Sequence, residues 1–172
     1  MYRLLFLALG LTACDSQTQP VGAPDCEPAL ASTVARIVWG EGADGVEIGD
    51  SEAAVRSTLG EPDGTALIDV PTAEAGLSWA NGPHAGVTVV FVSRPDGPAD
   101  AGVVRLDRPY TGRAASGVGI GATRAEVACA YGPAAQGSES LVRYDAGDVA
   151  HLVAFAADTV RSIEMWDRTV LD

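Results

Sequence analysis

Two stretches of this chain, residues 45–60 and 117–132, repeat each other at an offset of 72 residues. The same residue stands at seven aligned positions, namely Gly45/Gly117, Val46/Val118, Ile48/Ile120, Gly49/Gly121, Ala53/Ala125, Val55/Val127 and Gly60/Gly132. Any fold for this chain must therefore build one local structure twice. We interpret the chain as a duplicated unit.

Each copy begins with the signature of a helix N-terminus. Thr123 is followed three residues later by Glu126, the spacing of a capping box, in which each side chain binds the backbone N–H of the other residue. Ser51 or Asp50 provides the cap in the first copy, where Ala54 stands in place of the glutamate. The pattern predicts one helix in each copy.

Each predicted helix is short and needs a sheet to pack against. Glycine ends each one, as expected at the left-handed position after a helix, at Gly60 and Gly132. The apolar pairs four residues apart share one helix face, and they are Val55/Leu59 and Val127/Tyr131. Helices of about eight to ten residues are not stable alone, so we expect packing to hold them.

The repeated pattern, Gly-hydrophobic-x-Ile-Gly-x-Ser/Thr-x-x-x-Val-x-x-x-Leu/Tyr-Gly with Pro62 soon after it, resembles the helix-start signature of the SmpA/OmlA family. These are small bacterial lipoproteins of outer-membrane protein assembly, and their fold is similar to that of the β-lactamase inhibitory proteins. The resemblance covers about sixteen residues per copy. The second copy departs from it, because Pro133 directly follows Gly132. The resemblance implies tandem repeats of a short helix and an antiparallel sheet.

The N-terminus reads as a lipoprotein signal peptide over residues 1–13. Arg3 precedes a short apolar run that ends in small residues, too short for a spanning helix. Residues 11–14, Leu-Thr-Ala-Cys, resemble a lipobox, which implies cleavage before Cys14 and its acylation by fatty chains such as palmitate. The alternative is an ordinary signal peptide with an incidental cysteine.

The segment after Cys14 reads as a tether over residues 14–31, since it is polar and punctuated by proline. Asp15 resembles the signal that retains lipoproteins in the inner membrane of enteric bacteria. Other lineages do not follow that rule, so the choice between inner and outer membrane stays open. The folded part is then divided into residues 32–113 and 114–172, one repeat each.

The charge of the chain argues against nucleic acid as a partner. The chain contains no lysine, and after cleavage it keeps 10 arginines against 23 acidic residues, a net charge of about −13. Nucleic-acid binding needs basic patches that displace counterions. The same acidity would repel anionic lipid headgroups, so membrane contact is expected only through the N-terminal anchor.

The rest of each copy reads as an antiparallel meander, which gives a two-layer α+β fold. We predict strands at 65–70, 76–80, 86–93 and 102–108 in the first copy, and at 140–145, 149–156 and 159–167 in the second. Matching positions in the two meanders are Trp79/Tyr144, Phe91/Phe155 and Asp107/Asp167. Residues 32–39 are predicted as a leading strand, with a helix as the alternative.

The cysteines predict one disulfide. Once Cys14 is acylated, Cys26 and Cys129 remain in an oxidising compartment, where a bridge is the expected state. The alternative is two free thiols, with Cys129 in the second helix. A nucleophilic role for Cys129 has no local support, because the sequence places no base near it.

No pattern predicts a metal, a cofactor or a catalytic group. His84 and His151 are the only histidines, and we interpret both as surface residues. The acidic run from Glu41 through Asp44 to Asp50 lacks calcium-loop spacing, so we interpret it as a solvated loop. The glycines at 117, 119 and 121 lack the lysine of a phosphate loop and are read as the turn before the helix.

The aromatic residues of the strands either fill the core or form a concave binding face, and the sequence leaves both open. Trp79 stands near polar Ser78 and Asn81, which suggests a half-exposed side chain. Trp79 and Tyr144 are therefore the candidate binding residues.

These observations predict a non-enzymatic, lipid-anchored protein of the bacterial cell envelope that presents a protein-binding α+β domain. The resemblance implies that the partner is an envelope assembly machine. The alternative is an inhibitor of a secreted or periplasmic hydrolase, as the β-lactamase inhibitory fold implies. An enzyme would need a pocket that brings His84 or His151 to a carboxylate or to Cys129.

Overall fold

The computed structural model describes residues 35–66 and 73–171. Its helices are α1 (Glu52–Leu59), α2 (Arg124–Tyr131), α3 (Arg168–Leu171) and the 3-10 helix η1 (Gly82–His84). Its strands are β1 (Ile37–Val38), β2 (Gly42–Ala43), β3 (Val46–Glu47), β4 (Gly64–Thr65), β5 (Ala73–Trp79), β6 (Val87–Arg94), β7 (Gly97–Asp107), β8 (Gln136–Gly137), β9 (Leu141–Ala146), β10 (Val149–Ala156) and β11 (Thr159–Asp167).

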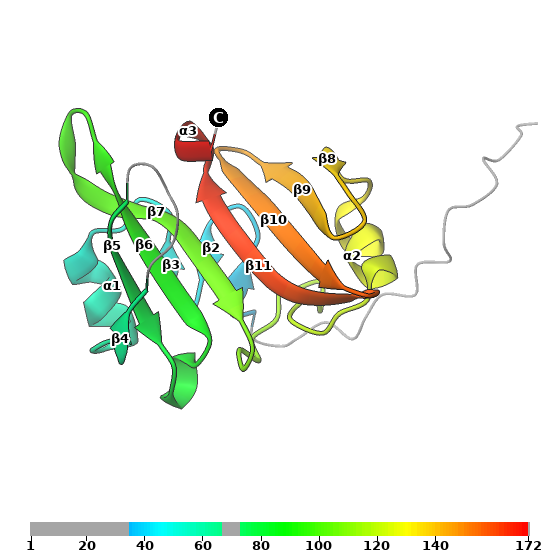
Figure 1. The fold of residues 1–172 in the computed structure, drawn as a ribbon, viewed down its shortest axis with the longest axis horizontal. Helices are drawn as coiled ribbons and strands as arrows, with labels where there is room; N and C mark the ends of the chain where they lie inside the picture. The colour runs from blue at the N-terminus through cyan, green and yellow to red at the C-terminus, as the bar shows by residue number, and fades with distance from the viewer. Residues whose placement is uncertain (1–34, 67–72, 172) are drawn as a thin grey trace, which may run out of the picture.

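Eight of these strands form one antiparallel sheet, in the order β4-β5-β6-β7-β11-β10-β9-β8. Figure 1 shows this sheet as a twisted ribbon, with α1 near its β5 end and α2 near its β9 end. The last strands of the two meanders, β7 and β11, pair with each other at the centre. The three short strands β1, β2 and β3 form a second sheet. The fold is therefore mixed α+β.

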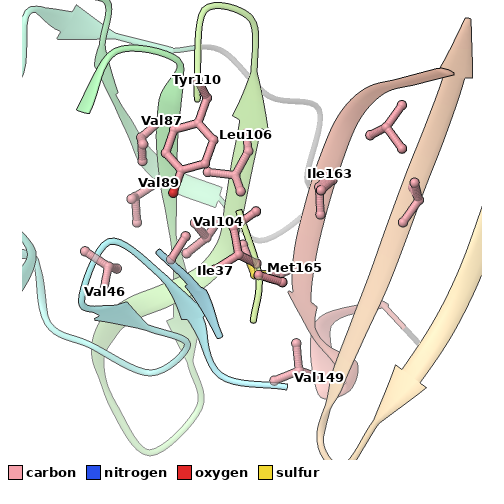
Figure 2. Close-up of a cluster of buried hydrophobic side chains, with 14 of the residues drawn as sticks. Ile37, Val46, Val87, Val89, Val104, Leu106, Tyr110, Val149, Ile163 and Met165 are labelled. Carbon is pink, nitrogen blue, oxygen red and sulfur yellow. The ribbon is translucent and has the colours of Figure 1, made fainter. Parts of the chain in front are cut away.

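One hydrophobic core joins these parts. Buried residues of α1, α2 and the three-stranded sheet belong to the same cluster as the inward side chains of β5 to β7 and β9 to β11. Figure 2 shows the middle of this core, where Ile37 of β1 points toward Val104 of β7 and Met165 of β11. The two helices and the small sheet thus cover one face of the large sheet.

The predicted helix signals are present in the structure. The Ser51 hydroxyl accepts a hydrogen bond from the Ala54 N–H (3.3 Å), and Thr123 and Glu126 form the full capping box. Gly60 and Gly132 follow the helices with φ of 80° and 74°. Glycine tolerates these angles without the steric cost that a Cβ would impose.

Each helix start is fixed to the sheet by two backbone hydrogen bonds at matching places. The four bonds, all 2.8 Å long, are Gly49 N–H to Ala101 O, Ala101 N–H to Asp50 O, Gly121 N–H to Val160 O, and Val160 N–H to Ala122 O. Both hairpins also carry a register shift directly before a phenylalanine, before Phe91 in β6 and before Phe155 in β10. The same backbone hydrogen bonds and the same register shift thus occur in both halves of the large sheet.

The structure differs from the sequence prediction where strands are short. Of the predicted strand at 32–39, only Ile37 and Val38 form β1, and residues 32–34 lie outside the described residues. Of the predicted strand at 65–70, only Thr65 lies in β4, and 67–70 are likewise outside them. The small β1-β2-β3 sheet was not predicted, because two-residue strands carry no alternation to detect.

Candidate binding cleft around Trp39

Three aromatic rings are stacked where the small sheet meets the second half of the large one. The Trp39 indole lies between Tyr131 of α2 and His151 of β10, with ring centroids 3.6 Å and 3.7 Å away and planes within 10° of parallel. Tyr144 of β9 lies across this stack, 5.9 Å from Trp39 at an angle of 68°. Residues far apart in the sequence thus form one aromatic cluster.

Local structure explains how each ring is placed. Tyr144 and His151 are direct partners in the β9–β10 register, so both side chains point to the same face of the sheet. Tyr131 is the last residue of α2 and follows the buried Val127 by one helical turn. Trp39 lies in the turn after β1, where Gly40 takes a φ of 90° and redirects the chain.

His151 holds this turn against the sheet. Its imidazole is fully buried, and Nε2 accepts a hydrogen bond from the Gly40 N–H (2.9 Å). The ring is therefore neutral with its proton on Nδ1, which has no hydrogen-bond partner within the described part of the chain. Burial lowers the pKa of His151 to about 3, although the nearby Asp145 carboxylate acts in the opposite direction.

The prediction that His151 is a surface residue is wrong. Val149, His151 and Val153 alternate along β10, and all three face the core. The residues between them, Ala150 and Leu152, are also apolar. The residues of β10 therefore show no polar–apolar alternation that would identify the inward face of the strand.

Two cavities share Trp39 and Tyr131 among their lining residues. The larger, of about 370 Å³, is lined by Trp39, Tyr131, Pro133, Ala135, Tyr144, Asp145 and Ala146. The second, of about 310 Å³, is lined by Ala35, Ile37, Val38, Trp39, Ala114, Ala115, Ser116 and Tyr131. We call the larger cavity and its lining residues the aromatic cleft. Neighbouring cavities with a shared aromatic wall are suited to receiving side chains of a partner.

The aromatic cleft offers a small number of polar groups. The Tyr144 side chain is largely buried, burial raises the pKa of its hydroxyl, and the hydroxyl makes no hydrogen bond within residues 35–66 and 73–171. Asp145 accepts a hydrogen bond from Arg143 Nε at one oxygen, Oδ1 (2.7 Å). The Tyr131 hydroxyl is already paired with that of Ser116 (2.8 Å). The lining of the cleft thus combines aromatic and small apolar side chains with polar groups.

A second polar cluster surrounds Asp44 and was not predicted. Both carboxylate oxygens are occupied, by Arg36 Nε (2.6 Å) and Nη2 (2.5 Å), His84 Nδ1 (2.8 Å) and the Tyr110 hydroxyl (3.0 Å). The Asp44 side chain is 1% exposed, so the reading of this residue as part of a solvated loop is wrong. Burial, with the Asp44 carboxylate close by, raises the pKa of Tyr110.

The Asp44 cluster brings His84 to a carboxylate, which is a contact that an enzyme would require. The other contacts of the cluster connect separate segments of the chain, as structural ion pairs do. Arg36 neutralises Asp44 through two hydrogen bonds, and the same arginine also binds the carbonyl of Pro83. The Asp44 carboxylate is thus shared among three side chains, those of Arg36, His84 and Tyr110. The cluster fastens the β2–β3 turn to η1 and to the segment after β7.

The two predicted binding residues have different environments. Tyr144 lines the aromatic cleft. Trp79 is 3% exposed and donates its indole N–H to the Gly60 carbonyl (3.3 Å), so the expectation of a half-exposed side chain is wrong. Its partner on the buried face is Leu77, whereas Ser78 lies on the other face of β5. Successive side chains of a strand point to opposite faces, so a polar residue next to Trp79 in the sequence does not indicate that Trp79 itself is exposed.

Two of the three cysteines in the sequence predictions lie outside the described residues. Cys129 lies on α2 and is half-buried, whereas Cys14 and Cys26 fall outside the described residues. Among the described residues, no three histidine, cysteine or acidic side chains gather as metal ligands. Within that same part of the chain, no helix combines the length and apolar character needed to cross a bilayer.

Comparison with known proteins gives two distant structural likenesses. No protein-family model matches the chain, and no curated protein matches it. An extracellular protein containing a SCP domain from Bacillus anthracis is 11% identical with a TM-score of 0.49, over 72% of this chain and 45% of that one. A DUF4309 family protein from Bacillus subtilis is 18% identical with a TM-score of 0.49, over 74% and 88%. This chain thus spans less than half of the first protein, and similarity at this level carries no functional argument.

Proposed function

We propose that this chain is a lipid-anchored protein of the bacterial cell envelope that binds another protein through the aromatic cleft. The observation that carries the proposal is the pair of cavities sharing Trp39 and Tyr131 as a wall. Both of these side chains are only half-buried. Tryptophan and tyrosine are the residues that most often dominate binding energy at protein interfaces, where they sit in or beside well-packed pockets.

The domain that presents this cleft is, on this proposal, a tandem repeat. Three kinds of contact support the duplication, each occurring at matching positions in both halves. They are the capped helix starts, the paired backbone hydrogen bonds at Ala101 and Val160, and the register shifts before Phe91 and Phe155. The cleft itself uses residues of the second copy together with Trp39, which precedes the first.

The anchor and location of the protein follow from the N-terminal sequence. Cys14 is the proposed lipidation site, and the polar segment after it holds the domain away from the bilayer. The partner then faces the periplasm or the cell surface, and it is by resemblance an envelope assembly component. The protein is proposed to act without a cofactor and without catalysis.

A photocrosslinking experiment in living cells tests this function. A photoreactive phenylalanine derivative replaces Ala135, an exposed residue of the aromatic cleft, and in a control strain it replaces Asp96, an exposed residue of the β6–β7 turn. We expect a discrete crosslinked protein from position 135 alone. The product should disappear when Trp39→Ala is added. Equal crosslinking from both positions, or none from either, would rule out the cleft as the binding site.

A Cys14→Ser variant separates the two envelope roles. An assembly partner in the membrane should be lost when the anchor is removed, because anchoring raises the effective concentration of the domain at the bilayer. A soluble hydrolase captured equally well by both forms would instead favour the inhibitor role. Capture should be quantified by mass spectrometry of the crosslinked product in each strain.

A further inference from the structure

We propose that the second of the two cavities is a docking site for this chain itself, filled by residues 27–34 with the Leu30 side chain inside. We call this cavity of about 310 Å³, together with its lining residues, the Ala35 cavity. Residues 27–34 lie outside the described residues. Because the occupant belongs to the same chain, the inference goes beyond the proposed function and does not depend on a partner.

The lining of the Ala35 cavity selects an apolar occupant. Five of its eight lining residues have hydrocarbon side chains, namely Ala35, Ile37, Val38, Ala114 and Ala115. The hydroxyl groups of Ser116 and Tyr131 are hydrogen-bonded to each other at 2.8 Å. A polar occupant would therefore give up its hydrogen bonds to water and find few partners in their place. Val38 is 43% exposed, so an apolar occupant also removes part of its surface from water.

The described part of the chain begins in the wall of this cavity. Ala35 is a lining residue, and the next two N–H groups, of Arg36 and Ile37, fix it by donating to the Arg113 carbonyl at 2.9 and 3.2 Å. A chain spans at most about 3.3–3.6 Å per residue, so Leu30 lies within about 17 Å of Ala35.

The residues that precede Ala35 supply a suitable apolar side chain. Residues 27–34 read Glu-Pro-Ala-Leu-Ala-Ser-Thr-Val, in which leucine is the largest apolar residue. A group attached through a short flexible segment has an effective concentration in the millimolar range at its site. A separate ligand must supply that concentration itself. Leu30 is therefore the occupant that the connectivity of the chain favours.

The predicted disulfide brings the other end of the segment to the same place. Cys129 lies on α2 two residues before Tyr131, which lines the Ala35 cavity. The Cα atoms of bridged cysteines are about 4.4–6.8 Å apart, so a bridged Cys26 lies beside α2. Residues 27–34 then connect two points near one cavity. Of the tether predicted over residues 14–31, only the part up to Cys26 separates the domain from the bilayer, by at most about 40 Å.

This occupant supports the wall that the cavity shares with the aromatic cleft. Trp39 and Tyr131 line both, and their side chains are only half-buried. Leu30 adds apolar contacts to these two rings and restricts their motion. The aromatic cleft itself stays open to a partner.

Nuclear Overhauser contacts measured on the full chain test the inference. The protein is purified from envelopes in detergent with isotope-labelled leucine methyl groups, and the Leu30 signals are assigned by their loss in Leu30→Ala. We expect contacts from the Leu30 methyl groups to the ring protons of Trp39 and Tyr131. A mixture of labelled and unlabelled chains identifies contacts between copies. Absence of both ring contacts, or contacts found only between copies, would overturn the inference.

A pair of acidic substitutions tests the role of Leu30 in the position of the wall. Leu30→Asp brings a charge to an apolar site, so the segment should leave the cavity and the indole N–H signal of Trp39 should shift. Val21→Asp is the matched control, since it makes the same kind of change on the other side of Cys26. It should leave the Trp39 signal in place. Equal shifts in the two variants would contradict the docking of Leu30.

A substitution in the cavity wall gives a test that leaves residues 27–34 unchanged. Ala115 is an exposed lining residue, and Ala115→Leu adds a side chain that competes for the same space. The contacts from Leu30 to Trp39 should be lost, while the indole signal of the distant, buried Trp79 reports an intact fold. Contacts that persist in this variant would show that Leu30 lies elsewhere. Crosslinking from position 135 probes the aromatic cleft, so its outcome is independent of these three results.

Discussion

The imidazole of His151 lies 3.7 Å from the indole of Trp39, ring against ring, and also accepts the N–H of Gly40, the next residue along the chain. One buried histidine thus determines both the position of the tryptophan and the path of the turn that carries it. A protonated imidazole donates from both nitrogens and cannot accept the Gly40 N–H. The aromatic cleft therefore depends on a neutral histidine.

Acid should destabilise the fold through His151. Its pKa is about 3 in the folded protein and about 6.5 in an unfolded chain, so the unfolded state binds the extra proton between these values. Stability should be constant above about pH 6.5 and should fall by up to about 1.4 kcal/mol per pH unit below it. Urea unfolding followed between pH 7.5 and about pH 5 measures this slope.

The comparison protein for this measurement is His151→Phe, which keeps an aromatic ring in the stack and removes the titrating group. It should be less stable than the wild type at pH 7.5, because the Gly40 N–H loses its acceptor. Its stability should change less between pH 7.5 and pH 5. Parallel pH profiles for the two proteins would show that His151 is not the acid-sensitive group.

Breaking the Asp44 cluster should cost far more than breaking an ion pair at the surface. Asp44→Asn leaves the guanidinium of Arg36 without its carboxylate in a partly buried site, and we expect a loss of about 3 kcal/mol. Glu52→Gln at the exposed Glu52–Arg56 pair is the matched control, and its loss should be much smaller because solvent screens that pair. Denaturant midpoints of the two variants test the difference, and equal losses would contradict the structural role of Asp44.

Two glycines with similar backbone angles should differ in their tolerance of alanine. Gly86 has φ of 89°, and a Cβ there would lie 2.3 Å from the carbonyl oxygen of Asp107, whereas Gly49 has φ of 96° and nothing within 4 Å. Gly49→Ala should cost about 1 kcal/mol from backbone strain alone. Gly86→Ala should cost at least about 2 kcal/mol more, because the backbone must move. Thermal unfolding of both variants decides this, and similar melting temperatures would contradict it.

The parts of the fold that the sequence predicted are those with a repeated or periodic signal. The caps at Ser51 and Thr123, the glycine stops and the long strands of both meanders each have a local pattern, and the structure contains them. Capping needs only residues within one turn of the chain, so it can be recognised without knowing the tertiary structure.

The candidate site was predicted only through Tyr144, because its other parts depend on tertiary contacts. Trp39 lies in a turn between two-residue strands, and its stacking partners are 92 and 112 residues away in the sequence. In the sequence, Asp44 has the features of a solvated turn residue. In the structure its carboxylate binds Arg36, His84 and Tyr110, which come from distant parts of the chain. The Asp44-Gly45 pair and the positive φ of Asp44 (55°) are consistent with a tight turn, yet they do not indicate burial.

A disulfide between Cys26 and Cys129 should stabilise the folded domain. It would close a loop of roughly 100 residues, for which loop-closure entropy gives up to about 4.7 kcal/mol. Cys26→Ser and Cys129→Ser should each lower stability, and the double variant should lose no more than either single one, because one bond is removed in all three. Cys14→Ser should leave unfolding unchanged when all proteins are compared in the same detergent. Additive losses of stability in the double variant would contradict the bridge, and so would a wild-type stability that a reductant does not change. Mass spectrometry of unreduced peptides would identify the joined cysteines directly.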